Sequence, residues 1–141
     1  MGQFVYYYQL ENISNSSLFK PIIYCNLKKI PEKDSFSLNI PLAIELKRYD
    51  TVHLRTMKLE SCLLKAINNL GDNPVIKDFD VMFNPSYQTD VLKVLINVCK
   101  KKQFSVIWPG YFREGKLFYS EEGYLDYKTY DIENYDVTIV V

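Results

Sequence analysis

The sequence is poor in the side chains that most often carry catalysis or bind metal ions. Its 141 residues include one His and three Cys. His53 and the widely separated Cys25, Cys62 and Cys99 form neither a zinc-binding spacing nor a disulfide framework. We therefore expect no metal site, and we interpret His53 as a structural or surface residue and the cysteines as small core residues. Reduced cysteines also predict a cytoplasmic protein.

Long apolar runs and a net charge are also missing. No run approaches the roughly 18 apolar residues of a membrane-spanning helix, so we expect no membrane contact. The start, MGQFVYYYQLENIS, lacks the positive charge and cleavage site of a signal peptide. Equal numbers of basic and acidic residues, 17 of each, argue against binding driven by charge alone. A hydrophobic content of 48% is that of a single folded domain.

Apolar runs and helical spacing predict alternating strands and helices. Two strand-helix-strand series predict right-handed βαβ units, one between strands 21–27 and 75–83 and the other between 75–83 and 104–108. The fold class is therefore α/β, with a three-layer, mostly parallel sheet in one domain, 1–141. Its body is 1–112, and a short β-rich extension covers 113–141. The predicted strands are 4–9, 21–27, 75–83, 104–108, 116–120 and 137–141, and the predicted helices are 41–49, 59–70 and 85–99.

Two acids, Asp78 and Asp80, occur near the end of predicted strand 75–83. Alternate residues of a strand share a face, so both carboxylates should lie together near the carboxyl end, where open α/β sheets bind ligands. A hydrophobic strand with this ending is typical of a Walker B segment, in which the first acid orients Mg²⁺ and the second polarises water. The alternative is two solvated acids at an exposed strand end.

A Walker B segment requires a phosphate-binding loop, and the segment upstream lacks its features. Such a loop uses glycines so that backbone N–H groups can surround the phosphates, and a Lys to meet their charge. Between strands 4–9 and 21–27 the chain reads ENISNSSLFK, without glycine, and Lys20 follows Ser16 and Ser17. ATP and Mg²⁺ are therefore disfavoured as cofactors. We assign no catalytic residue and do not expect ATP hydrolysis.

The C-terminal half carries the most distinctive pattern in the chain. Trp-Pro-Gly stands at the end of strand 104–108, then come KLFYS and the series Glu-Gly-Tyr-Leu-Asp-Tyr. Together with Phe-Asn-Pro after the acid-ended strand, this order resembles the P-loop-containing BrxF family of BREX bacteriophage-defence systems. The resemblance covers about 75–141, with a weaker similarity over IIYCNLKK. The matching residues are Asp78, Asp80, Phe83, Asn84, Pro85, Asp90, Trp108, Gly110, Leu117, Tyr119, Glu121, Gly123, Tyr127 and Tyr130.

The resemblance implies a degenerate P-loop NTPase-like core that has lost its phosphate loop. It further implies a noncatalytic accessory or regulatory subunit that contacts other proteins of an antiphage defence system. Tyrosine provides large contact areas at low entropy cost, so aromatic residues of the C-terminal half are the candidate protein interface. These candidates are Tyr111, Phe112, Tyr119, Tyr124, Tyr127 and Tyr130.

Two alternatives stay open at this point. The first is a nucleotide-binding or ATP-hydrolysing protein that uses Asp78 and Asp80 with an atypical loop. The second is a DNA-binding accessory protein whose contacts are Lys100, Lys101 and Lys102, with Lys28 and Lys29 nearby in sequence to strand 21–27. A lysine run at a helix end is also typical of a solvated helix cap.

The net charge of zero conceals two unequal parts. Residues 1–112 carry 14 Lys and Arg against 10 Asp and Glu, a balance of +4, whereas 113–141 carry 3 against 7, a balance of −4. The body is therefore mildly basic and the tyrosine-rich extension is acidic. This division favours a protein partner for the extension and weakens the charge objection to nucleic acid for the body.

Overall fold

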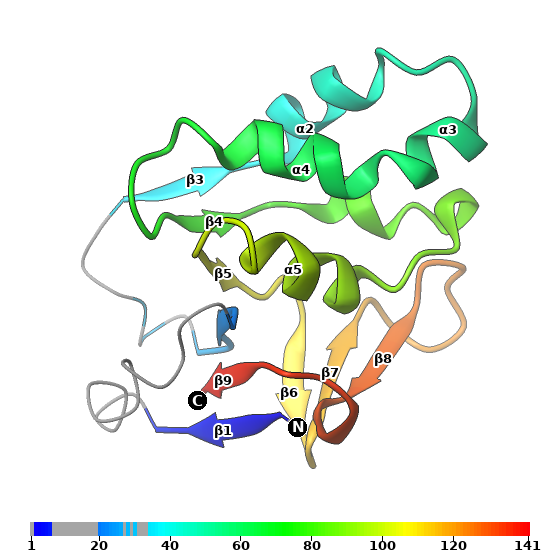
Figure 1. The fold of residues 1–141 in the computed structure, drawn as a ribbon. Coiled ribbons are helices and arrows are strands. Elements are labelled where there is room, and N and C mark those ends of the chain that lie inside the picture. The colour runs from blue at the N-terminus through cyan, green and yellow to red at the C-terminus, as the bar shows by residue number, and fades with distance from the viewer. Residues whose placement is uncertain (1, 7–19, 27, 29, 31–33) are drawn as a thin grey trace.

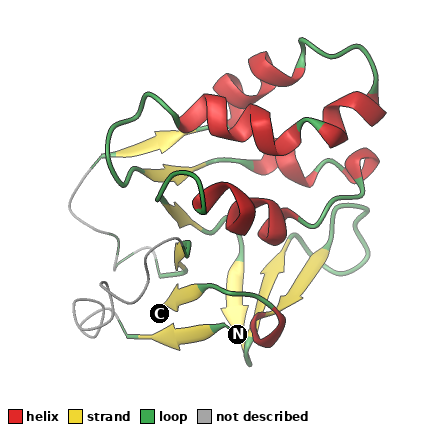
Figure 2. Cartoon of the chain, in the orientation of Figure 1, coloured by secondary structure: helices red, strands yellow, loops and turns green. Residues whose placement is uncertain are grey.

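A computed structural model of the chain describes residues 2–6, 20–26, 28, 30 and 34–141. It contains both helices and strands, which Figure 2 separates by colour. The helices are α2 (Asn39–Leu46), α3 (Val52–Met57), α4 (Leu59–Ile67) and α5 (Val91–Cys99), with 3-10 turns η3 (Asp80–Phe83), η4 (Pro85–Tyr87) and η5 (Ile132–Asn134). The strands are β1 (Gln3–Val5), β2 (Ile22–Tyr24), β3 (Ser35–Ser37), β4 (Val75–Lys77), β5 (Ser105–Ile107), β6 (Tyr111–Arg113), β7 (Lys116–Tyr119), β8 (Lys128–Asp131) and β9 (Thr138–Val140).

Six strands form the main sheet, in the order β1-β9-β2-β5-β4-β3. Every neighbouring pair in it is parallel. The strands β6, β7 and β8 form a separate antiparallel sheet. The predicted mixed α/β fold with a mostly parallel sheet is therefore confirmed.

The last strand of the chain is part of the main sheet. β9 lies between β1 and β2, and Figure 1 shows it beside β1. Its central residue, Ile139, pairs with Phe4 on one side and Ile23 on the other. Residues 113–141 thus return to the body of the protein after forming two strands of the small sheet.

One predicted βαβ unit is confirmed and the other begins at a different strand. β4, α5 and β5 follow each other in the chain, and β4 and β5 are parallel neighbours. The parallel neighbour of β4 on its other side is β3, rather than the strand predicted at 21–27. β3 has the sequence Ser-Phe-Ser and lies at the edge of the sheet, so it lacks the apolar run by which buried strands are found.

The predicted strand 75–83 is wrong beyond Lys77. Asp78 has a positive φ of 50°, which ends the extended backbone. Phe79 and Met82 then turn into the core, and the chain continues as η3. The apolar residues at 79–83 therefore belong to the turn that leads into η3 and to η3 itself, and not to a strand.

The predicted helix 85–99 is divided in two. Asn84 accepts a hydrogen bond from the Ser86 N–H at 3.0 Å and caps η4. Gln88 then adopts a left-handed conformation, with φ 47°. α5 begins after Asp90, whose carboxylate accepts a hydrogen bond from the Lys93 N–H at 3.1 Å.

The main core lies between one face of the parallel sheet and the helices. Ile23, Ile76, Val106 and Ile139 are fully buried, share a face through the strand register, and belong to one cluster with the apolar residues of α2, α4 and α5. Side chains of the opposite face, among them Val75, are buried outside this cluster. Within the described ranges the helices cover one face, and the predicted third layer stays a prediction. No helix in these ranges is long and apolar enough to cross a membrane.

Trp108 joins the small sheet to the main sheet. It follows β5, and its indole N–H donates a hydrogen bond to the carbonyl oxygen of Phe118 in β7, 2.8 Å away. The ring meets Phe83 and Tyr130 edge-on, at centroid distances of 5.7 and 5.9 Å. Gly110 permits this approach, because a Cβ there would collide with the same carbonyl oxygen.

We predict that Gly110→Ala destabilises the protein by about 1–3 kcal/mol, since the added methyl group forces the two sheets apart. Urea denaturation of the variant and the parent protein measures this. The exposed Glu122→Ala, on the small sheet's long loop, is the control and should change stability by less than about 0.5 kcal/mol. Equal stabilities of Gly110→Ala and the parent would contradict the proposed close contact.

Candidate functional site

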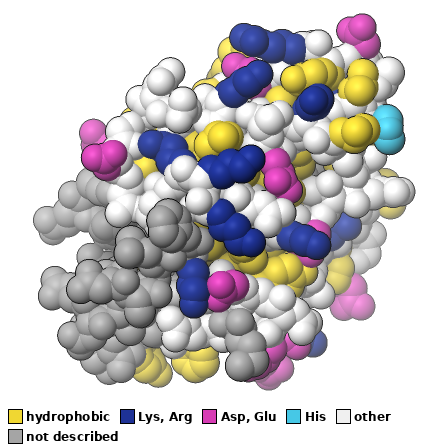
Figure 3. Space-filling model, in the orientation of Figure 1, with side chains coloured by type: hydrophobic (Ala, Val, Ile, Leu, Met, Phe, Trp, Pro, Cys, Tyr) yellow, Lys and Arg dark blue, Asp and Glu magenta, His cyan; other side chains and the backbone are white. Residues whose placement is uncertain are grey.

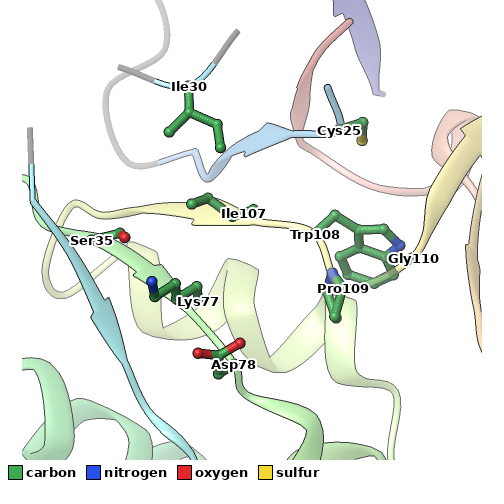
Figure 4. Close-up of a pocket in the computed structure, with 9 residues that line it drawn as sticks. All are labelled: Cys25, Ile30, Ser35, Lys77, Asp78, Ile107, Trp108, Pro109 and Gly110. Atoms are coloured by element: carbon green, nitrogen blue, oxygen red, sulfur yellow. The ribbon is translucent and has the colours of Figure 1, made fainter. Parts of the chain in front are cut away.

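A cavity of about 560 Å³ opens at the carboxyl ends of β2, β4 and β5. Its volume lies within the usual range for small-molecule sites, roughly 300–1,000 Å³. Figure 4 shows Lys77 and Asp78 together at the end of β4, across the cavity from Ile30 and Cys25. The lining residues are Cys25, Ile30, Ser35, Lys77, Asp78, Ile107, Trp108, Pro109 and Gly110.

The two predicted Walker B acids are in different surroundings. Asp78 is exposed and lines the cavity. Asp80 lies in η3, where it accepts a hydrogen bond from the Tyr119 hydroxyl at 3.0 Å and another from the Asn39 amide at 3.4 Å. The prediction that both carboxylates share one strand face is therefore wrong, because the strand ends before either residue. Asp80 has the contacts of a residue that links η3 to α2 and β7.

Two of the predicted interface tyrosines belong to a buried aromatic cluster. Tyr119 stacks on Phe83 with a centroid distance of 3.7 Å and an interplanar angle of 4°, and Tyr130 lies edge-on to Trp108. Both side chains are at most 9% exposed. Tyr135 extends the cluster, and its hydroxyl donates a 2.6 Å hydrogen bond to Asp90. These tyrosines hold the small sheet against η3 and α5, and burial leaves Tyr119 and Tyr130 little surface for a partner.

The other four predicted interface residues differ in exposure. Tyr111 is 45% exposed and Tyr124 is 64% exposed. Phe112 is half-buried and packs against the main core, and Tyr127 is half-buried. Tyr111 and Tyr124 are thus the predicted residues that the fold leaves available for contacts.

The β7–β8 connection, residues 120–127, presents an apolar tip among acids, and we call it the acidic loop. Leu125 at its tip is 90% exposed, beside Tyr124. The Tyr124 and Tyr127 N–H groups donate hydrogen bonds to the carbonyls of Glu121 and Tyr124, both at 3.1 Å. The Ser120 hydroxyl donates to Asp126 at 2.7 Å. The sequence analysis did not select Leu125 as a contact residue. An apolar pair such as Tyr124 and Leu125, placed between acids in a glycine-containing loop, could have indicated it.

A second apolar surface lies on α2 and α3. Ile40 and Met57 are 75% and 65% exposed, and Ile44, Val52 and Leu54 are exposed as well. In Figure 3, apolar side chains gather over α3 around the only histidine, and Lys and Arg side chains adjoin them. Large exposed apolar patches mark contact surfaces. Sequence periodicity missed this surface, because it assigned no helix to 52–57. His53 is exposed on α3, as a surface residue.

The three lysines proposed for DNA contact follow α5. Lys100 and Lys101 are exposed, whereas Lys102 donates a 2.6 Å hydrogen bond to the Gly71 carbonyl. Because they immediately precede β5, they lie at the edge of the sheet opposite the cavity. Their role in DNA binding stays a prediction. Lys29 and residues 11–19 of the segment judged unable to form a phosphate loop lie outside the described residues. Lys20, the last residue of that segment, forms an ion pair with Asp136 at 3.1 Å.

The cysteines have the properties of structural residues. Burial raises the pKa of the Cys25 thiol to about 12. It also raises the pKa of Cys99 to about 11, partly offset by a hydrogen bond with Phe104. Such thiols remain protonated and unreactive near neutral pH. In the described part of the chain, no group of three or more His, Cys, Asp or Glu side chains could hold a metal ion.

Comparisons with protein-family models, curated proteins and solved structures found no match for this chain. A functional conclusion therefore depends on the surfaces and cavities described above.

We predict that stability falls as the pH rises above about 10, the ordinary tyrosine pKa. Burial raises the pKa values of Tyr119, Tyr130 and Tyr135, and hydrogen bonds to Asp80 and Asp90 add to the effect for Tyr119 and Tyr135. The unfolded chain then releases protons that the native state retains, which favours unfolding at high pH. Urea midpoints measured from about pH 8 to 12 test this, and Tyr119→Phe should reduce the slope. A stability independent of pH in that range would contradict it.

Proposed function

We propose that the chain is a noncatalytic accessory subunit of a bacterial antiphage defence system of the BREX type, and that it acts through contacts with other proteins of that system. The observation that carries the proposal is the side chain of Leu125, 90% exposed at the tip of the acidic loop. The sequence resemblance over about 75–141 provides the defence context.

The acidic loop has the features of a preformed protein-binding element. Three local hydrogen bonds order it, so little conformational entropy is lost when a partner binds. Leu125 and Tyr124 provide apolar and aromatic contact area, and the carboxylates of Glu121, Glu122 and Asp126 surround them. A partner that fits has an apolar pocket with a basic rim.

Several features support a noncatalytic role. Asp80 is engaged by Tyr119 and Asn39, and the cysteine thiols remain protonated. β2 is the central strand from which a phosphate loop would lead, yet 25–34, which connects it to β3, contains no glycine. Close approach of backbone N–H groups to phosphates depends on such glycines.

Nucleotide binding is the second candidate function, and the cavity favours it. It lies at the carboxyl ends of parallel strands, where open α/β sheets bind ligands. Lys77 offers an ammonium group for a phosphate, and Asp78 offers a carboxylate for a cation. This candidate requires a ligand to be held without a glycine-rich loop.

For the accessory-subunit proposal, we predict that Leu125→Glu abolishes co-purification of BREX-type proteins from cells that carry the gene, with a loss of roughly thirtyfold or more in affinity. The same variant should fail to restore phage resistance to cells lacking the gene. The exposed Thr129→Glu, on β8, adds the same charge outside the loop and should behave as the parent protein. If deletion of the gene leaves phage resistance unchanged, the proposed role in defence is wrong.

A titration with Mg-ATP distinguishes the two candidate functions. If the chain is an accessory subunit that binds no nucleotide, we predict that Mg-ATP leaves its melting temperature unchanged. A ligand at one hundred times its Kd stabilises a protein by about 2.7 kcal/mol, which a thermal-shift titration detects readily. A rise that Asp78→Ala abolishes and that the exposed Asp72→Ala retains would establish nucleotide binding at the cavity, the second candidate function, and would contradict the expected lack of Mg-ATP binding.

A further inference from the structure

Two hollows share Cys25 as a lining residue beside the carboxyl end of β2. One is the cavity of about 560 Å³ between β2, β5 and β4. The other, of about 450 Å³, lies on the β9 side of β2. Cys25 lines both of them, so we call the pair the carboxyl-edge trough. The second hollow is lined by Cys25, Asn26, Lys28, Tyr111, Phe112 and Val141.

An aromatic ring stands at one end of the carboxyl-edge trough in a braced position. Tyr111 stacks on Phe118, its direct partner across the β6–β7 pair, with a centroid distance of 4.7 Å and an interplanar angle of 9°. The Arg113 guanidinium lies 5.9 and 5.6 Å from the two ring centroids. Tyr111 is nevertheless 45% exposed. A ring that is held in place and open to solvent can stack on a planar ligand at little entropic cost.

Each hollow also contains one amine. Lys28 is exposed in the second hollow, and Lys77 is half-buried in the first. Asp78 places one carboxylate beside Lys77. The amines suit successive phosphates of a chain, and the carboxylate can accept a hydrogen bond from the amino group of a base.

We propose that the carboxyl-edge trough binds single-stranded nucleic acid, with one base stacked on Tyr111 and neighbouring phosphates at Lys28 and Lys77. The combination of a backbone-tracking cationic groove with an exposed aromatic ring is the general means by which proteins hold single strands. Each hollow is of a size that encloses a small ligand such as one nucleotide. A single strand is favoured over a duplex, because the paired and stacked bases of a duplex leave no base free to stack on Tyr111.

The test is fluorescence anisotropy of a labelled oligothymidylate, titrated with the full chain at several salt concentrations. We expect binding at low salt that Tyr111→Ala weakens roughly tenfold, as loss of one base stack should. The exposed Tyr124→Ala, outside the trough, is the aromatic control and should bind as the parent does. Thermal unfolding of each variant shows that it is folded.

Salt dependence tests the phosphate contacts separately. Lys28→Gln and Lys77→Gln should each reduce the slope of log K against log salt by about 0.7, the value for one phosphate contact of a single strand. Lys101→Gln, at the opposite edge of the sheet, should leave the slope unchanged. Lack of binding at low salt, binding that Tyr111→Ala and Lys28→Gln leave intact, or tighter binding of a duplex of equal length would each overturn the proposal.

This inference is independent of the accessory-subunit proposal, because the acidic loop and the carboxyl-edge trough share no residue. Leu125→Glu should therefore retain oligonucleotide binding while it loses protein partners. Tyr111→Ala should show the reverse. Either proposal can thus fail while the other is upheld.

Discussion

The contact of Trp108 with β7 is the interaction on which the arrangement of this protein depends. The indole leaves the end of the central strand β5 and donates its N–H to the Phe118 carbonyl. Gly110 allows the backbones to come this close. Because Phe83 and Tyr130 pack against the same ring, one side chain joins the parallel sheet, η3 and the antiparallel sheet. The small sheet consequently stands beside the carboxyl edge of the large one, where Tyr111 and Phe112 of β6 line one hollow and the preceding residues 108–110 line the other.

In this arrangement, some of the residues that the sequence indicates as functional are buried in the packing, and others remain at the surface. The aromatic cluster requires Tyr119 and Tyr130 in its interior, and the Tyr119 hydroxyl engages Asp80. One half of the supposed Walker B pair thus becomes part of the packing. Asp78 remains at the cavity because its left-handed backbone turns the chain away from the strand. Exposed contact area is left at the acidic loop and on α2 and α3, and the proposed protein contacts move to those surfaces.

Sequence reasoning succeeded where an element has a strong periodic pattern. The apolar stripe of α4, the pair β4 and β5 around α5, and the terminal strand β9 all lie within the ranges predicted for them. It failed at β3 and α3, which are short and have few buried side chains. At 75–83 it failed for a different reason, because a buried 3-10 turn and a buried strand both appear as a run of apolar residues. The left-handed residue that separates the two is Asp78, and an aspartate does not by itself predict that conformation.

The sequence by itself determined the α/β class, the parallel βαβ unit and the lack of a glycine-rich phosphate loop in 11–20, because these follow from local composition and period. It also showed that an acidic C-terminal part follows a basic body. Only the tertiary structure decided which tyrosines are buried, that Asp78 and Asp80 lie in different surroundings, and that Lys28, Lys77 and Tyr111 line two hollows that share Cys25. Those outcomes depend on contacts between residues far apart in the chain, and the sheet order that brings them together is not encoded in any local pattern.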